Sequence, residues 1–318
     1  MTGESEKKRP RIAIVGAGPI GSILAAYIAG AADELAVVEI IPELAAALRE
    51  KGMTVSGCAS AATGPVRVVS SVAELRPLCP EIVFVAVKAC SLGSVAPALK
   101  DALPGDSIVV SFQNGLDTEV ELGERLGKDR MVRMIVNYAG NIVEPGHVKM
   151  SFFNKPNYVG AIERGDSAAA ARIADLMNQV GLETKIVNDI RKYVWEKTIL
   201  NSALSPLCAL SRMTMKASMD FPDVFEIVVG VLKEGIAVAR ADGYEFGKDF
   251  LDFCIAYLRK AGHHKPSMLC DVEACRPTEI DYLSGRIAHY AQKYSLPAPI
   301  NTTIAALVRG LEKTLLGR

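Results

Sequence analysis

The sequence has little of what marks a disulfide-linked, metal-binding or membrane-spanning protein. Its seven cysteines are odd in number and irregularly spaced, with no Cys-x-x-Cys pair, so we expect reduced thiols rather than a disulfide framework or a zinc site. Only four histidines occur, and only two of them are adjacent, so no metal site is expected. No uncharged apolar run reaches the roughly 18 residues that a membrane span requires.

Charge of one sign is also lacking. Lys and Arg total 36 and Asp and Glu total 36, so no net charge favours nucleic acid or an anionic membrane as a partner. The charged stretch from Glu4 to Arg9 is not followed by an apolar signal core, and we therefore expect no signal peptide and a cytoplasmic location. With 318 residues, half of them hydrophobic, the chain is long enough for two domains.

What is present begins with a glycine-rich turn. The β-branched run Arg11 to Val15 predicts a strand, and the Ala-rich stretch Ser22 to Ala29 predicts a helix. Between them, Gly16 suits a sharp turn, Gly18 leaves the backbone open to a pyrophosphate, and Gly21 allows close packing of helix and strand. The predicted cofactor-binding residues are Gly16, Ala17, Gly18, Pro19, Ile20 and Gly21. The alternative is a structural turn that carries three glycines by chance.

An acidic residue follows at the distance expected of a dinucleotide site. Glu39 ends the predicted strand Leu35 to Glu39, 23 residues beyond Gly16, where a Rossmann fold hydrogen-bonds the adenine ribose of NAD. A carboxylate there repels a 2′-phosphate, and residues 40 to 42 supply no Arg that would bind one. The local residues favour NAD(H) slightly. The alternative is a surface Glu at a strand end.

Strands and helices alternate over the first 188 residues, which predicts an α/β, doubly wound Rossmann-type domain. The further expected strands are two short ones within Thr54 to Val69, then Glu81 to Val87, Ser107 to Phe112, Met131 to Val136, a final pair His147 to Ser151 and Asn157 to Gly160, and an edge strand Glu183 to Val187. The further expected helices are Pro42 to Lys51 and Ser167 to Val180.

From residue 189 the periodicity becomes helical and strand signals almost vanish, which predicts an all-α C-terminal domain. The expected helices are Ile190 to Ala209, Phe221 to Arg240, Asp249 to Lys260, Glu279 to Tyr294 and Asn301 to Leu315. We therefore expect a dinucleotide-binding domain over residues 1–188 and a helical substrate and catalytic domain over residues 189–318.

Two polar residues follow buried strands of the first domain. Lys88 comes after the apolar run that ends at Val87, and Asn114 comes after the strand that ends at Phe112. Ligands of open α/β sheets bind beyond the carboxyl ends of the strands, so both residues are candidates for contact with cofactor or substrate. The alternatives are a solvated charge for Lys88 and a turn residue for Asn114, which precedes Gly115.

In the helical half, Lys197 and Asn201 are four residues apart and so lie on one helical face. A Lys on a largely apolar helix is desolvated, which lowers its pKa and suits proton donation. The alternative is a Lys that reaches out to water. Further on, Thr278 has the pattern of a helix N-cap with Asp281 as its capping partner, which would put Glu279 in the first helical turn.

Taken together, these motifs resemble those of the ketopantoate reductase (2-dehydropantoate 2-reductase) family almost end to end. The matching residues are Gly16 to Gly21, Val87-Lys88-Ala89, Gln113-Asn114-Gly115, Trp195-x-Lys197-x-x-x-Asn201, Ser267-Met268-Leu269-x-Asp271, and Thr278-Glu279-Ile280-Asp281 with Gly285. The resemblance implies a Rossmann domain, a helical domain, and reduction of ketopantoate to pantoate for pantothenate and coenzyme A synthesis, usually with NADPH.

The resemblance also implies roles for individual residues. Lys197 matches the catalytic proton donor and Glu279 matches its acidic partner, while Lys88 and Asn114 match residues on the cofactor side. Asn114 also matches a substrate contact, as do Asn201 and Ser267. Three positions depart from the family pattern: Ser205 stands where a second Asn is common, His264 stands near an expected Asn, and Glu39 occupies the region of the Arg that reads the 2′-phosphate.

The leading hypothesis is therefore an NAD(P)H-dependent reductase of a small 2-keto acid, ketopantoate first. An NAD-dependent D-2-hydroxyacid dehydrogenase acting on a bulkier 2-keto acid is the alternative, motivated by Ser205 and Glu39. A non-catalytic dinucleotide-sensing module is a second alternative. Family habit favours NADP(H), whereas Glu39 and the missing Arg favour NAD(H). The apolar helices of the second half could pair two subunits as a homodimer or could belong to the core.

Overall fold

The computed structural model describes residues 9–163 and 167–317 and divides the chain into two compact units. The α/β unit consists of the described residues up to 87 together with 91–113 and 119–190. The helical unit consists of residues 88–90, 114–118 and those from 191 onward. Two short segments that lie between strands of the α/β unit in sequence thus group with the helical unit. Residues 4–8 of the charged N-terminal stretch lie outside the described residues.

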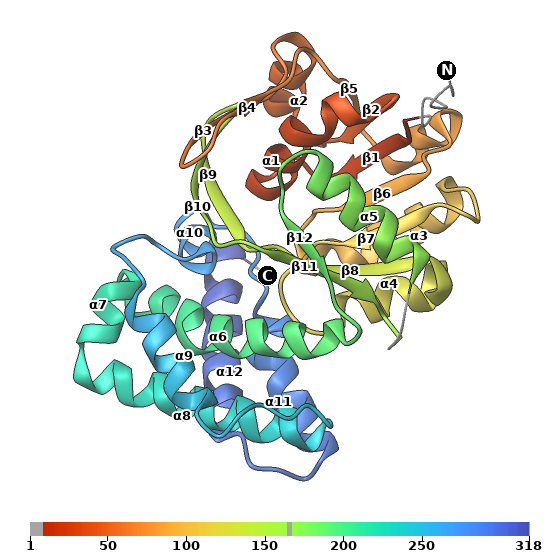
Figure 1. Cartoon of the computed structure of the whole chain (residues 1–318). Helices are drawn as coiled ribbons and strands as arrows, with labels where there is room; N and C mark the ends of the chain where they lie inside the picture. Colours follow the sequence, from red (N-terminus) through yellow and green to blue (C-terminus); the bar gives the residue numbers. More distant parts are fainter. Residues whose placement is uncertain (1–8, 164–166, 318) are drawn as a thin grey trace. The chain divides into compact units, whose positions relative to one another are not determined.

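The α/β unit is built on an eight-stranded sheet of order β12-β11-β8-β7-β6-β1-β2-β5 (Figure 1). All neighbouring strands pair in parallel except β11, which runs antiparallel to β8. The strands are β1 Arg11–Val15, β2 Glu34–Val38, β5 Arg67–Val69, β6 Ile82–Val85, β7 Ile108–Ser111, β8 Met131–Ile135, β11 Asn157–Ala161 and β12 Thr184–Ile186. This order places β1 in the interior of the sheet, third from the β5 edge and between β2 and β6.

The central strands are buried on both faces, as expected of a parallel sheet covered by helices. Ile12, Ile14 and Phe84 pack in one cluster with apolar residues of the helices that follow β1, β2 and β11. The alternating residues Ala13 and Val83 are also fully buried. The helices of this unit are α1 Pro19–Ile28, α2 Pro42–Glu50, α3 Leu92–Ala102, α4 Thr118–Leu126 and α5 Ala168–Gln179, with 3-10 turns η1 Ala29–Ala31, η2 Val72–Leu78, η3 Ala89–Ser91 and η4 Lys128–Arg130.

A second, four-stranded sheet of order β4-β3-β10-β9 packs against α1. Its strands are β3 Thr54–Gly57, β4 Ala61–Ala62, β9 Tyr138–Glu144 and β10 His147–Phe153. The sequence-based pairing of His147–Ser151 with Asn157–Gly160 was wrong, because β10 pairs with β9 and β3 whereas β11 joins the large sheet. Strand β9 was not predicted, because only its first residue is buried and its exposed residues from Asn141 onward lack the pattern of a buried strand.

The helical unit contains seven α-helices of six to twenty-two residues, counted over the described part of the chain after Val187. They are α6 Ile190–Ser211, α7 Met215–Asp220, α8 Pro222–Ala241, α9 Phe250–Arg259, α10 Ser267–Glu273, α11 Ser284–Lys293 and α12 Pro299–Leu316, with the 3-10 turn η5 Ile280–Tyr282. The short helices α7 and α10 were not predicted. Helix α12 packs on α11 and α8. The predicted fold class, a Rossmann-type unit followed by a helical one, is confirmed.

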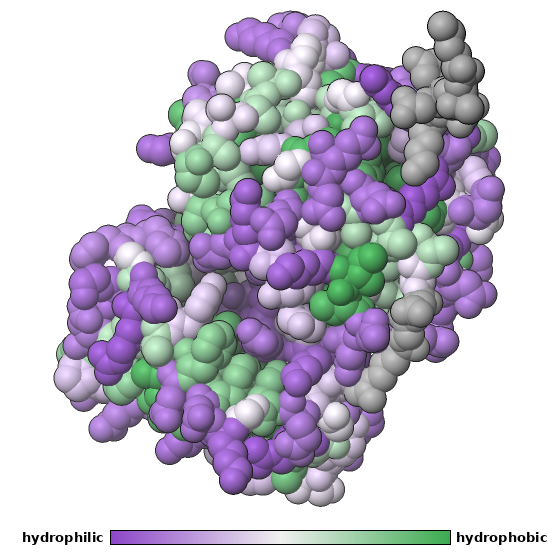
Figure 2. All heavy atoms as spheres, viewed as in Figure 1, coloured by the Kyte–Doolittle hydropathy of each residue, from purple (hydrophilic) through white to green (hydrophobic). Residues whose placement is uncertain are grey.

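Mainly hydrophilic side chains cover the face shown in Figure 2, with smaller apolar areas between them. Within residues 9–163 and 167–317, no helix is long and apolar enough to cross a membrane. All seven cysteines are free thiols.

Candidate active site

The glycine turn of the α/β unit has two positions where a side chain cannot fit and one where it can. Gly16 has a φ of +101°, and a Cβ there would lie 2.9 Å from Val87 Cγ1. A Cβ at Gly21 would lie 2.0 Å from the carbonyl oxygen of Gly16. Gly18 has nothing within 4 Å of such an atom. The turn therefore needs Gly16 and Gly21 for its own packing and leaves the backbone open at Gly18, which fits the approach of a pyrophosphate.

Helix α1 begins directly after this open position. Pro19 is its first residue, where a missing N–H costs nothing. Gly18 is the N-cap residue, and the helix has no side-chain capping hydrogen bond there. Ala17 is buried, whereas Ile20 is partly exposed. The free N–H groups and the positive end of the helix dipole are the usual contacts of a phosphate at such a turn.

Glu39 lies at the end of β2 and bonds to the glycine turn itself. The carboxylate accepts the backbone N–H of Ala17 at 3.0 Å and that of Ile41 at 2.8 Å. Glu39 is buried, while Ile40 and Ile41 beside it are 78% and 53% exposed. The sequence predicted an acid near the turn but did not indicate that this acid would also fix the turn.

In the helical unit, two carboxylates hold the segment 88–90. Asp271, which is buried on α10, forms an ion pair with the ammonium of Lys88. Its other oxygen lies 3.2 Å from Arg276 Nη2. Glu279 accepts the backbone N–H of Ala89 at 3.0 Å through Oε1. The side chain of Lys88 and the backbone of Ala89 are thus each fixed by a carboxylate from a distant part of the sequence.

Asn114 joins the same group. Its side-chain nitrogen donates to Glu279 Oε2 over a long 3.4 Å. The structure therefore brings together three of the residues predicted from the sequence, Lys88, Asn114 and Glu279, and adds Asp271. Asp271 was part of a recognised motif but was not predicted as a site residue. The sequence did contain a signal for Asp271: it lies four residues after the predicted site residue Ser267, so the two share one face of α10.

The environment of Glu279 favours its protonated form. Burial raises the pKa of Glu279 above its ordinary value, and the negative charge of Asp271 acts in the same direction. The Ala89 N–H, the charge of Lys88 and the amide of Asn114 act in the opposite direction but are outweighed by burial. A carboxyl group with a raised pKa keeps its proton to a higher pH than an exposed Glu does, which suits a group that holds or passes on a proton.

Helix α6 carries the remaining polar residues of the predicted site. Lys197, Asn201 and Ser205 are spaced by four residues within this continuous helix and so share one face. Lys197 and Asn201 are partly exposed, and Ser205 is buried. Ser267 is exposed in the first turn of α10. Lys197, Asn201 and Ser205 therefore form a row of polar residues along one face of α6.

The predicted helix start at Thr278 was wrong. Thr278 Oγ1 accepts the N–H of Ile280, two residues on, and α11 begins later, at Ser284. Glu279 precedes the 3-10 turn η5, with its side chain turned to Ala89 and Asn114. The capping pattern failed because these long-range contacts determine the conformation of Glu279, whereas a capping box considers only local ones.

Among the residues with described positions, no group of three His, Cys, Asp or Glu side chains could hold a metal ion. The donors present in the helical unit are instead carboxylates paired with Lys and Arg.

Comparison with solved structures shows the same fold. A PanE/ApbA family ketopantoate reductase from Ralstonia eutropha JMP134 superposes with a TM-score of 0.87 at 24% identity, over 96% of this chain and 99% of that one. The ternary complex of D-mandelate dehydrogenase with NADH and anilino(oxo)acetate also gives a TM-score of 0.87, at 22% identity and the same coverage.

Comparison with curated proteins and family models identifies the family. A relative from Archaeoglobus fulgidus named 2-dehydropantoate 2-reductase is 30% identical over 311 residues, which cover 96% of this chain and 99% of the relative. One of the same name from Pyrococcus abyssi is 28% identical, with 95% and 98% covered. The family model "Ketopantoate reductase PanE/ApbA" matches residues 12–164, and its C-terminal counterpart matches residues 189–312. As its motifs predicted, the chain belongs to the ketopantoate reductase PanE/ApbA family, a family of enzymes.

Proposed function

We propose that this protein reduces 2-dehydropantoate to pantoate with a reduced nicotinamide cofactor. The observation that carries the proposal is the match of both units, over almost the whole chain, to relatives named 2-dehydropantoate 2-reductase. Residues 1–188 would bind the cofactor, and residues 189–318 would supply most of the catalytic and substrate contacts. The bound nicotinamide supplies a hydride to the keto carbon.

The side chains of the helical unit supply the proton and the orientation. Lys197 donates a proton to the carbonyl oxygen, which stabilises the negative charge that develops there. Glu279, held between Ala89 and Asn114, orients the ammonium group of Lys197 or a substrate hydroxyl. Asn201, Ser205 and Ser267 contact the substrate.

On the cofactor side, the open backbone at Gly18 supports pyrophosphate binding. Asn114 helps to orient the nicotinamide and the substrate. Lys88, whose charge is balanced by Asp271, contributes a positive charge on this side. These roles follow the resemblance residue by residue, and the local geometry is compatible with each.

We further propose NADH as the preferred cofactor. Glu39 keeps a carboxylate at the end of β2, and the exposed residues next to it, Ile40 and Ile41, are apolar and cannot pair with a 2′-phosphate. A fluorescence titration with NADH and NADPH tests this directly. Tighter binding of NADPH would contradict the proposal, whereas Glu39→Gln should narrow the difference between the two cofactors.

The substrate preference is tested by steady-state kinetics with ketopantoate, a branched 2-keto acid and a phenylglyoxylate-type acid. The highest kcat/KM with ketopantoate supports the main proposal. The highest value with the aromatic acid would favour the D-2-hydroxyacid dehydrogenase alternative, for which the fold of D-mandelate dehydrogenase gives a specific reason. Tight cofactor binding without turnover of any keto acid would instead favour the sensing module.

We also propose that the protein is a cytoplasmic homodimer. One solved neighbour, of 19% identity, is titled a dimeric ketopantoate reductase from Staphylococcus aureus. In the helical unit an apolar groove is lined by Leu207, Val224, Ile227, Ile300, Ile304 and Leu307. A second copy would cover this groove. Light scattering on the Leu307→Asp variant should then report a monomer where the unmodified protein reports a dimer.

A further inference from the structure

The loop that carries Asn114 packs closely against the 3-10 turn η5 of the helical unit. Gly115 has a φ of +93°, and a Cβ there would lie 2.5 Å from the carbonyl oxygen of Tyr282. The N–H of Leu116 donates to that same oxygen at 2.9 Å. The backbone around Asn114 is thus fixed against the 3-10 turn η5, directly after Glu279.

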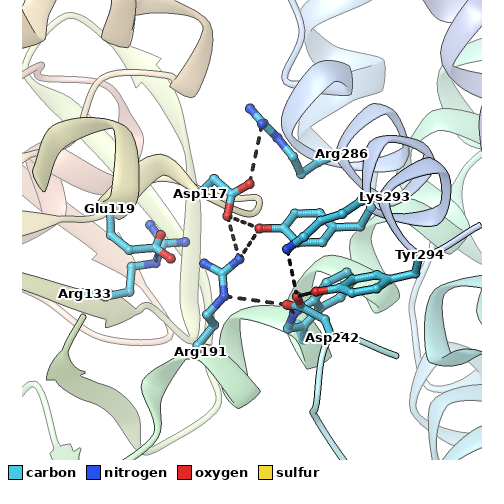
Figure 3. A network of polar contacts seen from close by, with 10 residues as sticks. Asp117, Glu119, Arg133, Arg191, Asp242, Arg286, Lys293 and Tyr294 are labelled. Atoms are coloured by element: carbon cyan, nitrogen blue, oxygen red, sulfur yellow. Dashed lines mark hydrogen bonds and ion pairs between the residues drawn. The ribbon is translucent and has the colours of Figure 1, made fainter. Parts of the chain in front are cut away.

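Asp117, at the far end of this loop, is held by three side chains (Figure 3). Its carboxylate accepts from Arg191 Nη2 at 2.6 Å and from the hydroxyl of Tyr290 at 2.9 Å. Arg286 Nη1 lies 3.5 Å from the other oxygen. Burial raises the pKa of Tyr290, so its hydroxyl stays a donor. Asp117 is therefore connected to the first turn of α6 and to α11.

The backbone of Asp117 is strained. Its φ of +66° lies in the left-handed region, which a residue with a side chain adopts at a cost in energy. Such conformations persist where the surrounding contacts determine them, and they are concentrated at functional sites. Here the three contacts of the carboxylate are what keeps Asp117 in this conformation.

The network continues from Arg191 to a second carboxylate, Asp242. Arg191 Nε lies 3.9 Å from Asp242 Oδ2, which also accepts the indole N–H of Trp195 at 3.0 Å. The ring of Trp195 packs edge-on against that of Tyr290, with centroids 5.4 Å apart. Arg191 and Trp195 lie in the first two turns of α6, so the network fixes the part of the helix that leads directly to Lys197.

We propose that Asp117 is a positioning residue for the reaction. By fixing Arg191 it holds the loop so that Asn114 meets Glu279, and it sets the start of the helix that carries Lys197. Asp117 touches neither substrate nor cofactor in this role. The inference rests on the proposed function, because it assigns Asp117 to the same reaction.

Two substitutions separate the charge of Asp117 from its backbone strain. Asp117→Gly removes the carboxylate at a cost in stability that relief of the positive φ partly offsets, and kcat of the folded protein should fall at least about tenfold. Asp117→Asn tolerates the same φ and keeps an acceptor, so it should recover part of the rate. Asp281→Asn is the matched control, because Asp281 is exposed and pairs with Arg309 instead. It should leave kcat within about twofold of the unmodified protein.

A double-mutant cycle tests whether Asp117 acts through Asn114. If it does, adding Asp117→Gly to Asn114→Ala should lower kcat by less than the full loss that Asp117→Gly causes alone. Fluorescence of Trp195, the single tryptophan, reports independently whether the network has changed. A shift of the emission in Asp117→Gly, absent in Asp281→Asn, is expected.

The inference is overturned if Asp117→Gly and Asp117→Asn both keep the kcat of the unmodified protein, or if the losses of Asp117→Gly and Asn114→Ala simply add. Should Asp117→Gly fail to fold, Asp117→Asn carries the same test. Failure of the proposed function is a different result, because the unmodified protein itself would then not reduce 2-dehydropantoate.

Discussion

The glycine turn of the α/β unit and the carboxylate cluster of the helical unit are assembled in different ways. The carboxylate cluster is formed by Asp271 and Glu279 with their partners Lys88, Ala89 and Asn114. The turn comes from one short stretch of backbone, Gly16 to Gly21, and is closed by the nearby Glu39. The cluster joins groups far apart in sequence: the backbone N–H of Ala89 donates to the carboxylate of Glu279, 190 positions away. The turn can therefore be tested through cofactor binding and stability, and the cluster through turnover.

The largest effect is expected from the helical unit. Lys197→Ala should lower kcat by about 10²- to 10⁴-fold, because the reaction loses its proton donor. The dissociation constant of the reduced cofactor should stay within about twofold, since the glycine turn is unchanged. Steady-state kinetics and a fluorescence titration measure the two quantities. Lys192→Ala, which changes an exposed residue of the same helix, is the control and should retain activity. Unchanged turnover in Lys197→Ala would remove the catalytic assignment.

The two kinds of glycine in the turn should respond differently. Gly18→Ala has space for its Cβ and an ordinary φ of −60°, so the melting temperature should stay unchanged while cofactor affinity falls about tenfold, or roughly 1.4 kcal/mol. Gly21→Ala places its Cβ against the backbone of Gly16 and should lower stability by about 1–3 kcal/mol. Thermal unfolding and cofactor titration distinguish the two. If Gly18→Ala and Gly21→Ala lowered the free energy of unfolding equally, the expected difference between the two positions would be wrong.

A smaller effect, on stability, is expected at Glu279. Its pKa is raised above the ordinary value of 4.5, because burial outweighs the Ala89 N–H, Lys88 and Asn114, with Asp271 adding to the increase. The folded state thus holds the proton more tightly than the unfolded state. The stability that the fold gains from holding this proton is fully present below pH 4.5, and it is lost as the pH rises through the folded-state pKa of Glu279.

The Glu279→Gln variant has no carboxyl group to deprotonate, so it does not lose stability in this way as the pH rises. Its free energy of unfolding, relative to that of the unmodified protein, should therefore increase as the pH rises above 4.5. Urea unfolding at a series of pH values measures the difference. The exposed Glu226→Gln serves as the control and should show a constant difference. A constant difference for Glu279→Gln as well would mean that burial does not govern its titration.

The smallest effect is expected at Ser205. Ser205→Asn restores the residue that is common in the family and should change the kcat/KM ratio between ketopantoate and a bulkier keto acid by about 2- to 10-fold. The NADH to NADPH preference should not change, because Ser205 lies on α6 and the glycine turn lies in the α/β unit. A change in cofactor preference would show that the two regions are not separable.

The difference between the two regions also explains what could be predicted from the sequence. The strand and helix around Gly16 depend on neighbours in sequence and were predicted, although α1 begins at Pro19, three residues before the expected start at Ser22. The long helices α6 and α8 were found from their periodicity. Lys88 and Asn114 were predicted from their places after buried strands and Glu279 through the family resemblance, whereas their mutual contacts appear only in the folded chain.

The errors have more than one physical cause. Strand β9 pairs locally with β10, but the small sheet also needs the pairing of β10 with β3, whose partners are 93 positions apart (147 − 54) and which no local pattern indicates. The capping box at Thr278 was a local pattern overruled by contacts from Ala89 and Asn114. Asp117 carried no sequence signal, because its importance comes from a left-handed backbone and from partners on α6 and α11.

The grouping of residues 88–90 and 114–118 with the helical unit bears on how the chain could be dissected or recombined. A fragment beginning at residue 189 would lack the partners of Asp271, Glu279 and Arg191 that these segments provide. Buried carboxylates without their partners destabilise a fold. A chimera that exchanges helical halves between relatives therefore needs to carry both short segments along with the C-terminal half, because the helical unit is discontinuous in sequence.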